Sequence, residues 1–198
     1  DQPDFKTRMD YGWSGTMSLP RVLSLGKDGK LLMDVPGEIE QLRYNARKKE
    51  NITLKADSEM LIDDISGNSI ELALEMNAKG ASQLGIKVCC SPDGEEQTLV
   101  FYDATEKKLK VDTRKSSVTE GPKNIEAGPF ELKKGESLKL RVFVDKSVVE
   151  VFANGRQAVM RRVYPSRDDS IGVILFSSGA PASIKTLEAW DIMPSNPY

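Results

Sequence analysis

The sequence contains no histidine, and this absence excludes several classes of site. Without an imidazole, the chain cannot build a Ser-His-Asp or Cys-His catalytic site, or a metal site with histidine ligands. Cysteine is almost as scarce, because Cys89 and Cys90 are the only two. Neighbouring residues of a strand point to opposite faces, so we expect one buried and one exposed thiol rather than a strained disulfide. We therefore predict no metal and no cofactor.

Strong net charge and long apolar runs are also missing. The formal net charge is −2, and no basic run exceeds the three residues Arg47–Lys49, so no basic surface for a phosphate backbone is expected. Apolar runs such as Val173–Phe176 are far too short to span a bilayer, and the N-terminus lacks the basic and apolar regions of a secretion signal. We expect neither a nucleic-acid nor a membrane partner. The compartment stays open, because a segment preceding residue 1 could have been removed.

What the sequence does contain is strand-like alternation, most clearly in residues 137–164. Apolar residues recur at every second position up to Val144, and they resume at Val148–Ala153. Asn154-Gly155 tolerates positive φ at both positions, which a two-residue type I′ turn requires. The sequence therefore predicts three consecutive antiparallel strands, with Ala153 opposite Arg156.

The N-terminal part predicts a hairpin and a linker. Strand-like runs at Gly15–Leu25 and Lys30–Val35 flank a turn at Gly26–Gly29. Pro36-Gly37 ends the second run, and Glu38–Lys49 is polar with apolar residues at helix-compatible spacing. We interpret this last stretch as a short helix or linker, and as the best candidate for a boundary between two structural units.

The remaining alternations give the fold class. They are separated by turns, and residues 113–129 form a polar loop that contains proline and glycine. About ten strands without a convincing long helix predict an all-β protein, a two-sheet antiparallel β-sandwich. The further predicted strands are Ile52–Ala56, Ser69–Ala78, Leu84–Cys90, Gln97–Tyr102, Lys108–Asp112, Ile171–Ser177 and Ser183–Ile192.

Several long segments resemble a known enzyme family. LRVFVDKSVVEVFANG (Leu140–Gly155), RRVYPSRDDSIGVILFSSG (Arg161–Gly179) and LEAWDI (Leu187–Ile192) are similar to the C-terminal β-sandwich module of glycoside hydrolase family 32, which contains invertases, levanases and inulinases. GWSGTMSLPRVLSLGKDGKL (Gly12–Leu31) and PGEIEQLR (Pro36–Arg43) resemble the end of that family's five-bladed propeller and its linker. The resemblance implies a remnant of the final propeller blade plus linker in residues 1–43. It implies a concanavalin-like jelly roll in residues 44–198.

The catalytic motifs of that family are absent from the sequence. The family uses a nucleophilic Asp in an Asn-Asp-Pro-Asn type motif, an acid/base Glu in Glu-Cys and a stabilising Asp in Arg-Asp-Pro, whereas this chain contains neither Asp-Pro nor Glu-Cys. Retaining hydrolysis needs two carboxyl groups about 5 Å apart, so no catalytic residue is assigned. Glu150 is a mid-strand candidate for an acid/base, but without a second carboxylate beside it an ion-paired or solvated role is favoured. The resemblance thus implies a glycosidase parent and a chain that is inactive alone.

Aromatic rings are the usual platforms for sugars, and Trp13 and Tyr102 are the predicted carbohydrate contacts. Two functions follow from the resemblance. The first is a non-catalytic module that packs on and stabilises the N-terminal five-bladed catalytic propeller of an enzyme acting on sucrose, levan or inulin. The second is a module that binds fructan by itself. A fructan oligosaccharide and a second copy of the chain are further candidate partners. A secreted or periplasmic location is favoured if the parent degrades polymeric fructan, and a cytoplasmic one if it hydrolyses imported sucrose derivatives.

Overall fold

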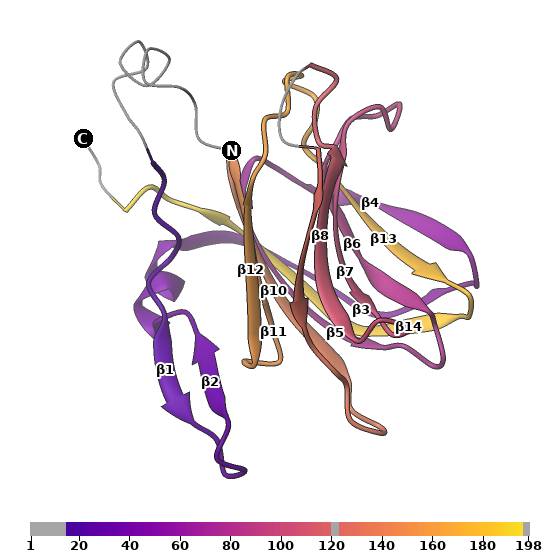
Figure 1. The fold of residues 1–198 in the computed structure, drawn as a ribbon. Coiled ribbons are helices and arrows are strands. Elements are labelled where there is room, and N and C mark those ends of the chain that lie inside the picture. The colour runs from indigo at the N-terminus through magenta and orange to yellow at the C-terminus, as the bar shows by residue number, and fades with distance from the viewer. Residues whose placement is uncertain (1–14, 120–122, 196–198) are drawn as a thin grey trace.

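Two six-stranded antiparallel sheets make up most of the computed structural model, which describes residues 15–119 and 123–195 (Figure 1). The predicted all-β, two-sheet antiparallel sandwich is confirmed. Sheet 1 has the strand order β12 (Gln157–Arg162), β11 (Val148–Ala153), β10 (Leu138–Asp145), β5 (Ser69–Asn77), β14 (Ala182–Ile192), β3 (Arg43–Leu54). Sheet 2 has the order β4 (Ser58–Ser66), β13 (Gly172–Ser178), β6 (Gln83–Cys90), β7 (Gln97–Asp103), β8 (Lys108–Lys115), β9 (Ile125–Pro129).

A small hairpin precedes the sandwich in the chain. Its strands are β1 (Val22–Leu25) and β2 (Leu31–Asp34), and a 3₁₀ helix, η1 (Gly37–Leu42), leads from it into β3. The predicted hairpin is confirmed, although its first strand begins at Val22 rather than at Gly15.

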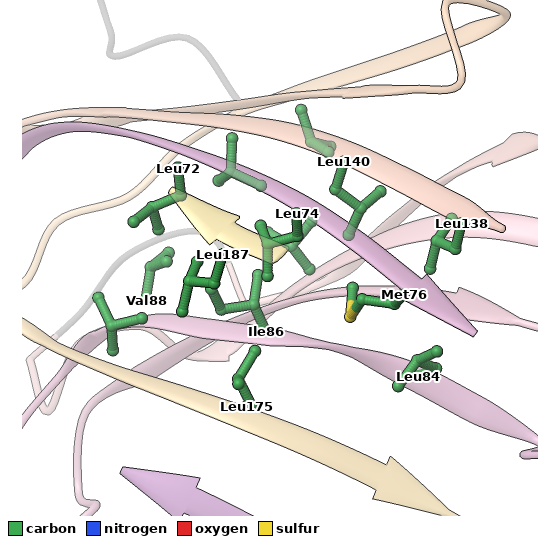
Figure 2. Packing of buried hydrophobic residues seen from close by; sticks show 14 of the residues in the cluster. Leu72, Leu74, Met76, Leu84, Ile86, Val88, Leu138, Leu140, Leu175 and Leu187 are labelled. Carbon is green, nitrogen blue, oxygen red and sulfur yellow. The ribbon is translucent and has the colours of Figure 1, made fainter. Parts of the chain in front are cut away.

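The core lies between the two sheets and follows from the alternation in the strands. Every second side chain of β5 points toward sheet 2 and is buried, while the residues between them point outward. Figure 2 shows several of these side chains packed against partners from β6, β10, β13 and β14. Full burial of each such aliphatic side chain contributes about 1.5–3 kcal/mol, so this layer is the main source of stability. The labelled residues are Leu72, Leu74, Met76, Leu84, Ile86, Val88, Leu138, Leu140, Leu175 and Leu187.

Three edge strands differ from the sequence prediction. The helix or linker predicted at Glu38–Lys49 is wrong beyond Leu42, because β3 starts at Arg43 and pairs with β14 along its length. The strand β4 was not predicted, and β9 lies inside the predicted loop 113–129. All three stand at the edge of a sheet, where a strand has a neighbour on one side only, and most of their residues are exposed. Their alternation is correspondingly weak.

The turn between β11 and β12 contains one residue more than predicted. Ala153 pairs with Gln157 rather than with Arg156, so the connection is Asn154–Arg156. Asn154 and Gly155 have φ of 49° and 62°, as a type I′ turn requires, and the Arg156 N–H donates to the Ala153 carbonyl at 2.9 Å. The turn chemistry was therefore predicted correctly, but the register was shifted by one residue.

The two cysteines also depart from the prediction. Both are buried, with 2% of each side chain exposed, so the predicted exposed thiol is wrong. Cys89 has φ of 52°, and at this point Val88 and Cys89 together oppose the single residue Val173 of β13. This bulge interrupts the alternation on which the prediction relied. Burial raises the pKa of both thiols to about 12, which makes them poor nucleophiles.

Candidate functional site: the covered face of sheet 1

Residues of the segment 15–42 lie against the outer side of sheet 1, so this side of the sandwich is partly covered (Figure 1). We call the outward-pointing residues Glu71, Arg141, Phe143, Glu150 and Phe152 the covered face. The Met33 N–H donates to the carbonyl of Gly155 at 2.8 Å, which ties β2 to the β11–β12 turn. The hairpin is therefore attached to the sandwich through backbone as well as side chains.

A small apolar cluster forms the centre of this contact. Val35, which follows β2, packs with the rings of Phe143 and Phe152, and Leu19 and Ile39 lie around them. The two rings meet edge to face with centroids 6.2 Å apart. Because these rings point away from the main core, their burial depends on the N-terminal segment.

Glu150 is the first of two carboxylates buried in the covered face, with 1% exposed. It accepts hydrogen bonds from the backbone N–H of Leu19 and from the Arg21 guanidinium, each at 2.9 Å. The predicted ion-paired role is confirmed, but the partner comes from the N-terminal segment. Arg161 of the neighbouring strand β12 bonds Glu126 and Asn124 rather than Glu150.

Glu71 is the second buried carboxylate and is fully enclosed. Arg43 donates to both of its oxygens, at 2.8 and 2.6 Å, and Arg141 donates to one of them at 2.9 Å. The guanidinium of Arg43 also lies 4.0 Å from the ring centroid of Trp190, while Arg141 reaches Asp34 of β2 at 3.2 Å. Bidentate arginine–carboxylate pairs are among the strongest polar contacts in proteins. This network joins the end of the linker, β2 and three strands of sheet 1.

The arrangement of Glu71 and Glu150 does not suit glycoside hydrolysis. Both pair with Phe143 of β10, from opposite sides, so one whole strand separates them. Strands lie about 4.8 Å apart, which places the two backbones roughly 10 Å from each other. Each carboxylate is also held by arginine. Retaining glycosidases instead need two carboxyl groups about 5 Å apart around an open sugar site.

The outer surface of the hairpin is apolar and exposed. Large side chains on both strands show half or more of their surface, namely Val22 51%, Leu23 59%, Leu25 75% and Leu31 53%. Leu23, Leu25 and Leu31 share one face of the hairpin, because Leu25 pairs with Leu31 and Leu23 is two residues away. A two-stranded hairpin is at best marginally stable alone, and exposed apolar surface of this kind marks a contact with further protein.

The two predicted carbohydrate contacts lie elsewhere or outside the described residues. Trp13 belongs to the segment 1–14, which the structure does not describe. Tyr102 points into the core with 6% exposed, and its ring meets Phe130 edge to face at 5.6 Å. Sugar contact at Tyr102 stays a prediction, and its burial does not favour it. Within residues 15–119 and 123–195, no cluster of three or more metal-ligating side chains occurs, and no helix there is long and apolar enough to cross a membrane.

Comparisons with known proteins place these features in context. A family model described as the C-terminal part of glycosyl hydrolases family 32 matches residues 38–191. The levanase of Bacillus subtilis is 33% identical over 186 residues, covering 88% of this chain and 27% of the levanase. The sucrose-6-phosphate hydrolase of Zymomonas mobilis is 28% identical over 190 residues, covering 93% of this chain and 36% of the hydrolase.

A comparison with solved structures shows that the fold of this chain is similar to part of a known enzyme structure. Fructan 1-exohydrolase IIa from Cichorium intybus matches with a TM-score of 0.87 and 20% identity, over 98% of this chain and 44% of that one. The chain thus spans less than half the length of each of these relatives.

Proposed function

The chain belongs to glycosyl hydrolase family 32 as its C-terminal module, and we propose that it is the non-catalytic part of a β-fructosidase, packing on and stabilising a catalytic propeller N-terminal to it. The observation that carries the proposal is the covered face. Two buried carboxylates of the sandwich bind residues 19–43: Glu150 takes both of its partners from there, and Glu71 takes Arg43 in addition to Arg141 of the sandwich. Without residues 19–43, Glu150 would lose both of its partners, and burying a charge is costly unless it is paired.

The hairpin provides the second support. It is fixed to the sandwich through β2 and exposes Val22, Leu23 and Leu25 of β1, which suits one blade edge of a larger assembly. We divide the chain accordingly into a remnant of the last propeller blade with its linker, residues 1–43, and the sandwich, residues 44–198. In this division Arg43 is the last residue of the linker, and its guanidinium donates a hydrogen bond to the carboxylate of Glu71.

The substrate class follows from the relatives. The proteins named above are a levanase, a sucrose-6-phosphate hydrolase and a fructan exohydrolase, so the proposed parent cleaves β-fructosides. The chemistry then lies in the propeller, since the buried carboxylates of this chain are too far apart and already paired. Fructan binding by the module itself and self-association stay predictions.

The experiment is an assay of fructose release from sucrose, inulin and levan by the 198-residue chain and by the complete reading frame that contains it. We expect hydrolysis by the complete protein and none by the chain. The Glu150→Gln variant of the chain is the control for catalysis by Glu150, the candidate acid/base. Turnover by the chain that this variant abolishes would overturn the proposal, as would a complete protein without any activity on fructosides.

A further inference from the structure

A pocket of about 370 Å³ lies at one end of the sandwich, away from the turn that contacts β2. It opens where three connections meet: β4–β5 at Asn68, β10–β11 at Lys146 and Ser147, and β12–β13 at residues 163–171. Its volume falls at the small end of the range of roughly 300–1,000 Å³ that small-molecule sites occupy. The site uses no residue of the covered face.

The three connections are joined by their backbones, so the pocket is already formed. The Lys146 N–H donates to the Asn68 carbonyl at 2.6 Å, and the Val163 N–H donates to the Ser147 carbonyl at 2.8 Å. On the other side, the Gly67 N–H donates to the carbonyl of Ile171 at 2.9 Å. Preorganised walls reduce the entropic cost of binding a ligand.

Glu96 holds the longest of these connections, β12–β13, in place through hydrogen bonds. Its carboxylate is fully buried and accepts hydrogen bonds from the hydroxyls of Ser166 and Ser170, at 2.6 and 2.5 Å. It also accepts from the backbone N–H groups of Ser166 and Val118. Burial alone would raise the pKa of Glu96, but these donors lower it to about 2. The carboxylate therefore stays charged and holds the loop in place at any ordinary pH.

The lining combines an apolar floor with polar groups that have no partner. Cys89 and Val163 are buried in the floor, and the half-buried ring of Tyr164 forms part of the wall. Among the described residues, four lining side chains make no hydrogen bond or ion pair: Ser147, which is half-buried, and Asn68, Lys146 and Asp168, which are exposed at the opening to solvent. Convergent polar groups over an apolar, aromatic surface are the usual features of a ligand site.

A second pocket, between the hairpin and the sandwich, differs from the loop-end pocket in how its charged groups are paired. Its volume is similar, about 380 Å³, but all of its charged groups except Lys139 are paired within the described part of the chain. Arg141 pairs with Glu71 and Asp34, and Glu75 pairs with Lys185. That hollow belongs to the contact between hairpin and sandwich, whereas the loop-end pocket has free donors and acceptors.

We propose that the loop-end pocket binds a neutral saccharide of one or two rings. The unpaired charges are one cation, Lys146, and one anion, Asp168, so they cancel. The other cation of the lining, Arg167, is already bound to Asp93 and Asp169, which leaves little positive charge for a phosphate. Sugar hydroxyls both donate and accept, and they match a set of amide, hydroxyl, ammonium and carboxylate groups. The ring of Tyr164 offers a surface for the apolar face of the sugar.

The test is a titration of the isotope-labelled 198-residue chain, followed by amide chemical shifts. The probes are fructose, sucrose and 1-kestose, with inorganic phosphate as the anionic probe. We expect saturable shifts with at least one sugar, concentrated at Asn68, Ser147 and residues 164–168, and no saturation by phosphate.

Two matched variants connect the binding to the pocket. Asp168→Asn removes the one free carboxylate and should weaken sugar binding about tenfold, because charge-assisted hydrogen bonds contribute more than neutral ones. Asp63→Asn makes the same change at an exposed position of β4 outside the pocket and should leave binding unchanged. The proposal fails if none of the three sugars saturates, if phosphate alone saturates, or if the shifts fall on other surfaces. None of these results would affect the docking role, which depends on the covered face.

Discussion

The outer faces of the two sheets both contain buried charges, but they differ in where the partners of those charges come from. On sheet 1, Glu71 and Glu150 are 0% and 1% exposed. Glu150 is paired with Arg21 of the N-terminal segment, whereas Glu71 is paired with Arg43, where the linker enters β3, and with Arg141 of β10. On sheet 2, Lys87 and Lys110 are 7% and 8% exposed. Their partners come from the same sheet and its turns.

The sheet 2 face is completed by its own side chains. Phe101 and Phe176 meet edge to face at 5.9 Å, and the ammonium groups of Lys110 and Lys87 lie 5.9 Å from one ring each. The lysine stems cover the rings while their charged ends reach carboxylates, such as Glu59 at 2.6 Å. This surface needs no other segment.

The comparison gives a simple rule for this fold. A buried charge that takes a partner from residues 19–43 marks a contact between the two proposed units, while one whose partners all lie in residues 44–198 belongs to a self-sufficient surface. Loss of a group of the first kind should therefore be far more costly than loss of one of the second kind, because removing one member of a buried pair leaves the other uncompensated.

Glu71→Ala should have the largest effect. It leaves Arg43 and Arg141 without their common partner, and we expect the free energy of unfolding to fall by about 3–5 kcal/mol. Urea unfolding of the chain measures this. Glu188→Ala, at a side chain 40% exposed on the same sheet, is the control and should change stability by less than about 0.5 kcal/mol. Equal effects of the two changes would remove the basis of the rule.

The sequence predicted which face of the sheet a side chain points to, but not the residues with which the buried charges pair. Alternation in β5 correctly places Glu71 outward, away from Leu72 and Leu74, yet an outward glutamate is normally solvated. Its burial depends on Arg43 and Arg141, which are 28 and 70 residues away in the chain. Single-sequence periodicity contains no information about such distant contacts, so the covered face could not be found from it.

Local chemistry was reliable where neighbours in sequence decide the structure. The turn at Asn154-Gly155 and the hairpin at Gly26–Gly29 depend on φ preferences and were predicted. The bulge at Cys89 and the added turn residue Arg156 were not, because each is set by pairing with another strand. Errors in register and in edge strands share this cause.

Glu96 extends the comparison to a buried charge that loops hold in place, because its donors come from the loops after β8 and β12. Its folded pKa of about 2 lies below the ordinary value of 4.5, so its contribution is full above pH 4.5 and is lost as the pH falls toward 2. The shift corresponds to about 3 kcal/mol. We expect the stability difference between the chain and its Glu96→Gln variant to shrink by roughly this amount between pH 5 and pH 2, measured by urea unfolding at each pH. A difference that is constant with pH would show that the charge of Glu96 contributes nothing.

Glu59→Ala should have a much smaller effect on stability, although the partner of Glu59, Lys87, is only 7% exposed. Glu59 is 54% exposed at the edge strand, and the freed ammonium can turn to water while its stem still covers Phe176. We expect a loss below about 1 kcal/mol, reduced further at high salt, in urea unfolding at two salt concentrations.

Lys87→Met sharpens this last measurement, because it keeps the stem over Phe176 and removes the charge. Replacement of a buried ion-pair member by an apolar residue of similar shape leaves only Glu59 unpaired, and that carboxylate is already solvated. The variant should therefore be as stable as the chain or slightly more so. A loss near that of Glu71→Ala, from either change, would mean that charges on the sheet 2 face depend on their partners just as those of the covered face do.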